Sequence, residues 1–197
     1  MDASASVGPV LFLNVTHLSV GAGARIGPFS VVRDMRLVHL GVNARLGQWN
    51  WISSAPAFWQ ADASGQLHIQ EGASVTSRHY LDCSGGISIG EFATVAGVRS
   101  TFISHGIDLS KNIQRCAPIA VGAFSIVGSN TKVVPGAHVP HHSLVAMGAV
   151  VAAGLEQAYG LYAGSPARLR KNLDQDSAYF TRTTARVSVS DGTVPPA

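Results

Sequence analysis

The chain has 197 residues, of which 46% are hydrophobic and 13% are charged, and its formal net charge is +3. The length and the 21 glycines predict one folded domain with many tight turns, and the apolar content argues against intrinsic disorder. Two cysteines indicate no disulfide scaffold. Basic side chains gather only around Arg168 and Lys171, a patch too small to predict a nucleic-acid partner. The sequence contains no targeting peptide and no stretch of ~20 apolar residues, so we expect a soluble, cytoplasmic protein without a membrane span.

Apolar residues begin to recur at a fixed spacing near the N-terminus. Residues 1–16 are expected to form a leader that caps one end of the fold, with an edge strand at 10–15. The period breaks over residues 33–39, where we expect an inserted turn. On either side of that break, the aliphatic residues spaced by six are Val20, Ile26 and Val32, then Leu40, Leu46 and Ile52.

Two segments without this period interrupt the middle of the chain. Residues 53–66 are rich in Pro, Ala, Ser and Gly, a composition typical of a loop, and they contain Phe58 and Trp59. Residues 106–118 are largely polar and form the second predicted excursion. The period returns between the two excursions, where Thr101 keeps the spacing but is polar. The aliphatic residues there are Ile69, Val75, Leu81, Ile89 and Val95.

The most regular stretch runs from Val121 to Val151, with an aliphatic residue at 121, 127, 133, 139, 145 and 151. A six-residue period matches no helix and is typical of a parallel β-helix, in which each hexad supplies one short strand and one turn. The inward residues of successive coils then stack at the inter-strand spacing of about 4.8 Å. We therefore predict an all-β fold, a parallel β-helix over residues 17–160, with about six coils.

Residues 161–197 follow the hexads and are expected to form a separate C-terminal segment. Residues 167–179 have helical propensity, and we predict a helix that folds back on the coil stack. Residues 182–197 are polar and are predicted to be a loose tail.

The segments that flank the hexads resemble those of a known family. Ser104-His105-Gly106-Ile107-Asp108 and Pro118-Ile119 precede the hexads, and Gly164-Ser165-Pro166-Ala167-Arg168 follows them. This order resembles the hexapeptide-repeat acyltransferases, and especially the sugar O-acetyltransferases of bacterial surface-polysaccharide pathways, over residues 17–172. The resemblance implies a left-handed β-helix, acetyl-coenzyme A as the acyl donor, and a homotrimer with active sites between subunits.

The resemblance also identifies a candidate general base. Acetyl transfer to a hydroxyl requires removal of the hydroxyl proton as the oxygen attacks the thioester, and histidine titrates near the working pH. The histidine of the family motif maps onto His105. Asp108 lies three residues further on, and its carboxylate is a candidate to orient the imidazole. The alternative for Asp108 is a loop-capping role.

By resemblance, the cofactor contacts map onto the C-terminal part of the hexads and the segment after them. The family usually has Gly-Ala-Gly-Ser where this chain has Ala146-Met147-Gly148-Ala149, so Met147 narrows the expected groove or shifts the contact to the backbone. Small residues allow close approach, and basic side chains bind phosphates strongly. The expected cofactor-binding residues are Ser129, Met147, Gly148, Pro166, Arg168 and Lys171.

The acceptor is expected to be a sugar or saccharide, and the two excursions offer candidate contacts. Trp59 is the candidate for stacking on a sugar ring. Asn112 and Gln114 are polar candidates for contacts to the acceptor or for stabilising the oxyanion.

Three alternatives remain open from the sequence. The first is transfer to the amine of an amino sugar rather than to a hydroxyl. The second is a β-helix scaffold that has the fold without the chemistry. The third is a zinc lyase built on His138, His141 and His142, although their spacing matches no zinc motif and we expect no metal.

Overall fold

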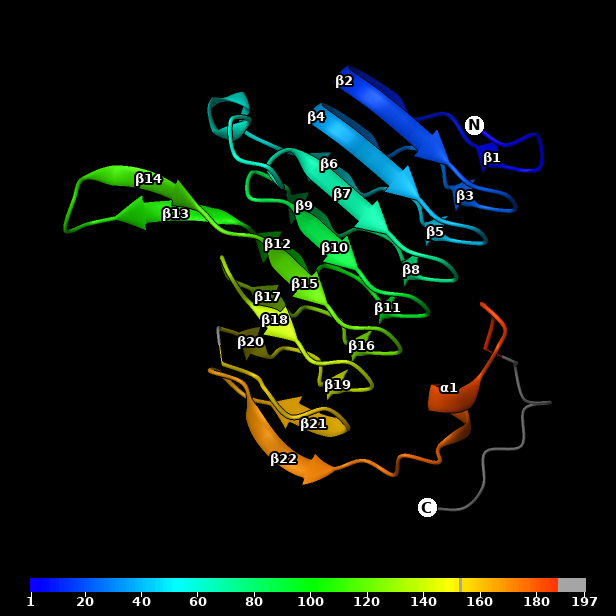
Figure 1. Cartoon of the computed structure of the whole chain (residues 1–197), viewed down its shortest axis with the longest axis vertical. Helices are drawn as coiled ribbons and strands as arrows, with labels where there is room; N and C mark the ends of the chain where they lie inside the picture. Colours follow the sequence, from blue (N-terminus) through cyan, green and yellow to red (C-terminus); the bar gives the residue numbers. More distant parts are fainter. Residues whose placement is uncertain (153, 188–197) are drawn as a thin grey trace.

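The computed structural model describes residues 1–152 and 154–187 and shows a left-handed parallel β-helix (Figure 1). The chain winds around a prism with three faces, and each coil adds one short strand to each face. Because all side chains that point inward meet those of the coils above and below, the core is one continuous apolar column. The predicted parallel β-helix is therefore confirmed.

The first face is a nine-stranded sheet, parallel except for its last strand. It begins within the predicted leader. In spatial order, its strands are β1 (Ser6–Val7), β3 (Arg25–Ile26), β5 (Arg45–Leu46), β8 (Ser74–Val75), β11 (Thr94–Val95), β16 (Ile126–Val127), β19 (Leu144–Val145), β21 (Gly160–Ala163) and β22 (Arg168–Asn172).

The second and third faces belong to one sheet, because β2 (Leu11–Val20) and β4 (Val31–Leu40) each run across both faces. The further strands of the second face are β6 (Trp51–Ser53), β9 (Tyr80–Asp82), β12 (Thr101–Ile103), β17 (Lys132–Val133) and β20 (Val150–Val151). Those of the third face are β7 (Gln66–Ile69), β10 (Ile87–Ile89), β15 (Ile119–Val121) and β18 (His138–Val139).

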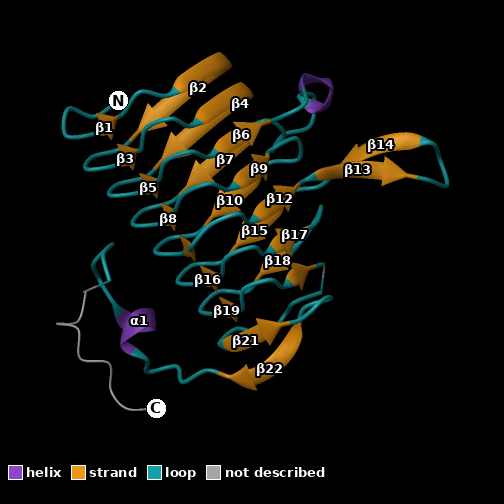
Figure 2. Cartoon of the chain, turned by 180° about the vertical axis from the view of Figure 1, so that it is seen from behind, coloured by secondary structure: helices purple, strands orange, loops and turns teal. Residues whose placement is uncertain are grey.

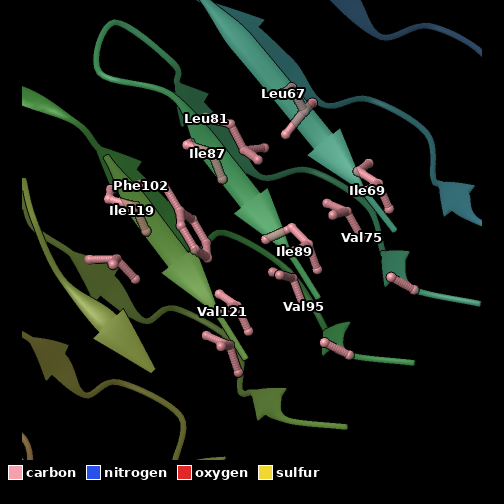
Figure 3. Close-up of a cluster of buried hydrophobic side chains, with 14 of the residues drawn as sticks. Leu67, Ile69, Val75, Leu81, Ile87, Ile89, Val95, Phe102, Ile119 and Val121 are labelled. Atoms are coloured by element: carbon pink, nitrogen blue, oxygen red, sulfur yellow. The ribbon is translucent and has the colours of Figure 1, made fainter. Parts of the chain in front are cut away.

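The hydrophobic core contains the residues that the six-residue period predicts. All six aliphatic residues from Val121 to Val151 are buried. Figure 3 shows equivalent side chains of the preceding coils stacked inside the prism, among them Ile69, Ile89 and Val121 on the third face. Thr101 is an exception, because the coil is one residue longer here and Phe102, rather than Thr101, points inward and is fully buried.

Side chains at the turns also stack from coil to coil. The corner between the third and first faces places one residue of each coil from Gly23 onward in the left-handed backbone region, with φ between 54° and 66°. Four of these residues are aromatic or histidine, and their rings stack into an aromatic ladder. Neighbouring rings of this aromatic ladder lie 4.8–5.0 Å apart between centroids. The ladder consists of Phe92, Phe124, His142 and Tyr159.

Two local predictions are wrong. Residues 33–39 form no inserted turn, because β4 continues through them and buries Met35 completely. The short C-terminal helical segment is present, but the bounds of 167–179 are wrong: β22 (Arg168–Asn172) pairs antiparallel with β21, and the only α-helix among the described residues is the four-residue α1 (Ala178–Thr181). The C-terminal segment does fold back along the coils, as Figure 2 shows.

Candidate active site

Both predicted excursions leave the β-helix at the same corner, between the second and third faces. The first contains the 3₁₀ helix η1 (Pro56–Phe58), and the second is a hairpin of β13 (His105–Asp108) and β14 (Ile113–Cys116) that projects from the prism (Figure 1). The coil between them turns the same corner tightly through Asp82 to Gly86. Residues far apart in sequence therefore meet at this corner.

The structure pairs His105 with Asp82, a residue that lies outside the sequence motif of His105. The Nδ1 atom of His105 lies 2.6 Å from Oδ2 of Asp82. The pairing follows from the coil register, because β12 lies beside β9 with Ile103 opposite Asp82. The carboxylate is 5% exposed and the imidazole 39% exposed. The buried carboxylate thus holds the ring at Nδ1, while the imidazole as a whole stays partly exposed.

Hydrogen bonds fix the Asp82 carboxylate in place. Oδ1 accepts from the backbone N–H of Ser84 (3.2 Å) and from its hydroxyl (2.5 Å), and Oδ2 accepts from the backbone N–H of Ser104 (2.9 Å). Burial by itself raises the pKa of Asp82, but the bonds from Ser84, His105 and Ser104 outweigh it, and the pKa lies below its ordinary value. Asp82 is therefore ionised at neutral pH and favours the tautomer of His105 that carries its proton on Nδ1.

Asp108 does not contact His105, which corrects the orienting role expected from the sequence. It stands at the outer end of β13, opposite Ile113, because the hairpin continues straight outward instead of folding back. Its carboxylate binds Arg115 (2.8 Å) and the hydroxyl of Ser110 (2.6 Å). These contacts stabilise the hairpin and its turn, in line with the loop-capping alternative.

The aromatic residue beside His105 is Phe58, with ring centroids 5.9 Å apart. The neighbouring Trp59 is partly buried, and its indole N–H donates to the hydroxyl of Ser54 at 2.9 Å. Arg36 donates to the backbone carbonyl of Trp59, so the loop is tied to β4. Trp59 thus anchors the loop that presents Phe58.

The two polar candidates of the hairpin lie away from His105 within one chain. Gln114 pairs with Ile107, two residues out from the pair of His105 and Cys116. Asn112 occupies the turn at the tip, with φ of 49°. A pocket of about 370 Å³ lies along the hairpin, between Ile107, Arg115 and Pro135.

The expected cofactor residues gather at a different corner, between the first and second faces. Ser129 and Gly148 occupy adjacent coils and are joined by a backbone hydrogen bond of 2.9 Å. Gly164 joins them on the next coil, because its carbonyl accepts from Val150. Met147 is 75% exposed at the same corner. Pro166 follows in a cis peptide bond, and Arg168 and Lys171 are exposed on β22. The structure therefore brings Ser129, Met147, Gly148, Pro166 and Arg168 to one corner, which is not the corner of His105, while Lys171 pairs with Leu161 farther along the first face.

The three histidines considered for zinc are not arranged around one point. His138 lies on β18 of the third face, whereas His142 belongs to the aromatic ladder. The Nδ1 atoms of His141 and His142 lie 2.7 Å apart. Within residues 1–152 and 154–187, no group of three His, Cys, Asp or Glu side chains is placed to hold a metal ion.

None of the helices in the described part of the chain is long and apolar enough to cross a membrane.

The fold is similar to those of solved structures, although no match is found at the level of sequence. No protein-family model matches the chain, and no curated protein matches it by sequence. Among solved structures, the acetyl-coenzyme A complex of the hexapeptide-repeat acetyltransferase VCA0836 from Vibrio cholerae matches with a TM-score of 0.58. The two chains are 18% identical, over 68% of this chain and 70% of that one. This chain therefore shares the left-handed β-helix fold of that hexapeptide-repeat protein.

Two further proteins with similar structures extend the comparison. The N-acyltransferase AntD from Bacillus cereus, crystallised as a mutant with dTDP and coenzyme A, has a TM-score of 0.55 at 15% identity, over 86% of this chain and 84% of that one. LpxA from Acinetobacter baumannii has a TM-score of 0.58 at 13% identity, over 87% and 71%. The hexapeptide-repeat fold is thus shared across nearly the whole described chain.

Proposed function

We propose that the protein is an acetyl-coenzyme A-dependent O-acetyltransferase that acts on a hydroxyl of a sugar, such as a surface-polysaccharide or glycoconjugate precursor. The observation that supports this most strongly is the pair of His105 and the buried Asp82 carboxylate. It provides an oriented, solvent-accessible imidazole on a fold shared with acyltransferases. A β-helix that served only as a scaffold would not need that pair.

In the proposed reaction, Nε2 of His105 accepts the proton of the acceptor hydroxyl as its oxygen attacks the thioester carbonyl. The new C–O bond forms, the C–S bond breaks, and the proton passes from Nε2 to the leaving thiolate. Asp82 stabilises the imidazolium between these two proton transfers. Both substrates are bound together, so the acyl group goes directly from donor to acceptor.

Acetyl-coenzyme A is the proposed donor, and the corner between the first and second faces fits it. Ser129 and Gly148 are small, and Gly148 has positive φ and open space beside its Cα, which allows close approach of a thin chain. Arg168 and Lys171 are exposed and suited to its phosphates. When bound there, the cofactor would supply the activated acetyl group.

The separation of the two corners supports a homotrimer as the working unit. His105 and Ser129 stand at opposite edges of the second face, so one chain does not place its base beside its own cofactor corner. In the proposed assembly, His105 of one chain faces the cofactor corner of a neighbour, and the projecting hairpin reaches toward that neighbour. Light scattering coupled to size-exclusion chromatography measures this assembly directly.

An amine acceptor is the second candidate. It is favoured by one comparison, since AntD is an N-acyltransferase whose mutant has also been crystallised with dTDP-4-amino-4,6-dideoxyglucose and coenzyme A. An amine arrives protonated at neutral pH, and the same imidazole would have to remove its proton. A panel that contains matched hydroxy and amino sugars separates the two candidates.

The decisive test is the release of free thiol from acetyl-coenzyme A over that panel, with wild type and His105→Ala. We expect a loss of roughly 10²- to 10⁴-fold in kcat, with unchanged affinity for acetyl-coenzyme A by calorimetry. His138→Ala, an exposed histidine on the third face, is the matched control and should retain full activity. Equal rates for His105→Ala and wild type would remove His105 from the mechanism. Tight cofactor binding without turnover on any acceptor would favour the scaffold.

A further inference from the structure

A further pocket lies on the first face, beside its corner with the third face and away from the His105 corner and the proposed cofactor corner. It has a volume of about 610 Å³ and lies between the N-terminal strands of that face and the C-terminal segment. Three arginines dominate its lining, together with an amide and two hydroxyl side chains. The polar lining residues are Arg25, Asn43, Arg45, Thr183, Thr184 and Arg186.

The fold itself brings the arginines together. Arg25 on β3 and Arg45 on β5 are direct partners in adjacent parallel strands, and both point outward from the prism. Neighbouring strands lie about 4.8 Å apart, so the two side chains leave the sheet next to each other and line the same pocket. Arg186 reaches the same pocket from the other end of the sequence.

Several contacts fix the segment that delivers Arg186. Arg182 donates to the backbone carbonyls of Phe92 and Tyr179, and its guanidinium carbon lies 3.8 Å from the centroid of the Tyr179 ring. The hydroxyl of Tyr179 donates to Thr94 on β11. Phe180 packs against the rings of His142 and Tyr159 in the aromatic ladder. The segment is therefore anchored just before it enters the pocket.

No carboxylate of the described residues neutralises these arginines. The ion pairs in that part of the chain join Arg33 with Asp34, Arg115 with Asp108, and His105 with Asp82. The Nε atom of Arg45 is buried and has no hydrogen-bond partner there. Burial, followed by the charges of Arg186 and Arg25, lowers the pKa of Arg45. The cluster thus has unused donors and unfavourable like-charge contacts.

We propose that this pocket binds the phosphate or diphosphate group of a small anionic ligand. Planar guanidinium groups donate in pairs to phosphate oxygens, and a diphosphate provides enough negative charge to offset three arginines. Asn43 and Thr183 add polar groups around the same space. The site is distinct from the proposed cofactor corner, which lies at the opposite end of the coil stack. A diphosphate could reach it free in solution or as part of a nucleoside diphosphate.

Isothermal titration calorimetry tests this with two probes, inorganic pyrophosphate and uridine diphosphate, in a buffer without phosphate. We expect one site per chain for wild type, at least tenfold weaker binding for Arg45→Gln, and binding within twofold of wild type for Arg33→Gln. Arg33 is the matched control because it lies on β4, outside the pocket, and is paired with Asp34. Affinity at least tenfold higher for uridine diphosphate would identify a nucleotide as the source, and similar affinities would identify the free diphosphate.

Thermal melting separates a binding role from a structural one. Without ligand, Arg45→Gln should melt at or above the temperature of wild type, because the substitution relieves repulsion in the cluster. Pyrophosphate should raise the melting temperature of wild type and Arg33→Gln but not that of Arg45→Gln. The proposal is overturned if neither probe binds wild type at millimolar concentration. It is equally overturned if Arg45→Gln binds pyrophosphate as tightly as wild type does.

Discussion

Replacing Asp82 by Asn tests how the carboxylate assists His105. The neighbours of Asp82 determine how an amide would sit. Oδ2 receives two N–H groups, from Ser104 and His105, whereas Oδ1 receives the Ser84 hydroxyl, which can rotate and accept instead, and a longer backbone bond. The Asn oxygen should therefore take the Oδ2 position. The proton of His105 then stays on Nδ1, and the substitution removes only the negative charge.

The size of the effect follows from that orientation. A hydrogen bond to a charged group contributes about 1.5–3 kcal/mol and a neutral one about 0.5–1.5 kcal/mol, so the imidazolium loses about 1.5 kcal/mol of stabilisation. Since each 1.36 kcal/mol is tenfold in rate, we expect Asp82→Asn to lower kcat by roughly 10- to 30-fold. Asp82→Ala leaves the imidazole without any partner on Nδ1, and its kcat should fall by roughly 10³-fold.

The assay is thiol release at saturating acetyl-coenzyme A and acceptor, with Asp108→Asn as the control. Asp108 binds Arg115 on the hairpin and should have little effect, with a rate within about threefold of wild type. A loss for Asp82→Asn as large as that for Asp82→Ala would show that the amide imposes the wrong tautomer and would refute the orientation argument. A larger loss for Asp108→Asn than for Asp82→Asn would refute the assignment of Asp82.

Two further predictions concern stability. His79 is buried, and burial lowers its pKa from 6.5 to about 4, so the unfolded chain binds the extra proton between these values. The free energy of unfolding should therefore fall by about 3 kcal/mol as the pH drops from 6.5 to 4, and urea unfolding of His79→Gln should lack this part of the slope. An identical slope in both proteins would contradict it. Phe102 is fully buried, and Phe102→Ala should cost about 3–5 kcal/mol of unfolding free energy in the same assay. Phe29→Ala, at an exposed position, should cost less than 1 kcal/mol, and comparable losses would contradict the burial argument.

The fold could be predicted because one physical constraint repeats along the chain. Every coil must place a side chain of limited size at the same inward position, so Val121, Val127 and Val133 are buried at successive faces and the period is visible in the sequence. Prediction failed where that constraint does not apply. The β4 strand crosses a corner without a turn, and Asp34 takes a positive φ of 54° within it, a feature that leaves no periodic signal.

The site was only partly predictable, for a related reason. His105 belongs to a motif that can be read within five residues, whereas Asp82 reaches it from the previous coil. Finding Asp82 requires the register between β9 and β12, and the longer coil around Thr101 shifts that register by one. A useful signal was present, since an acidic residue directly after the inward Leu81 interrupts an otherwise apolar and small-residue repeat. Such an acidic residue is a candidate to orient a histidine whenever the next coil carries a histidine at the same corner.

The loop that contains η1 and the β13–β14 hairpin both leave the prism at the corner between the second and third faces. The stacking of inward side chains is continuous before and after each of them. Ile52 leads into the first loop and Leu67 follows it, and Phe102 and Ile119 bracket the hairpin in the same way; all four are buried. The buried side chains of the coils therefore tolerate little substitution, whereas the two loops at this corner can change in length and sequence. Loops of other lengths could be grafted between these buried pairs to accept other substrates, and the cost to folding would be little more than the entropy of closing a longer loop.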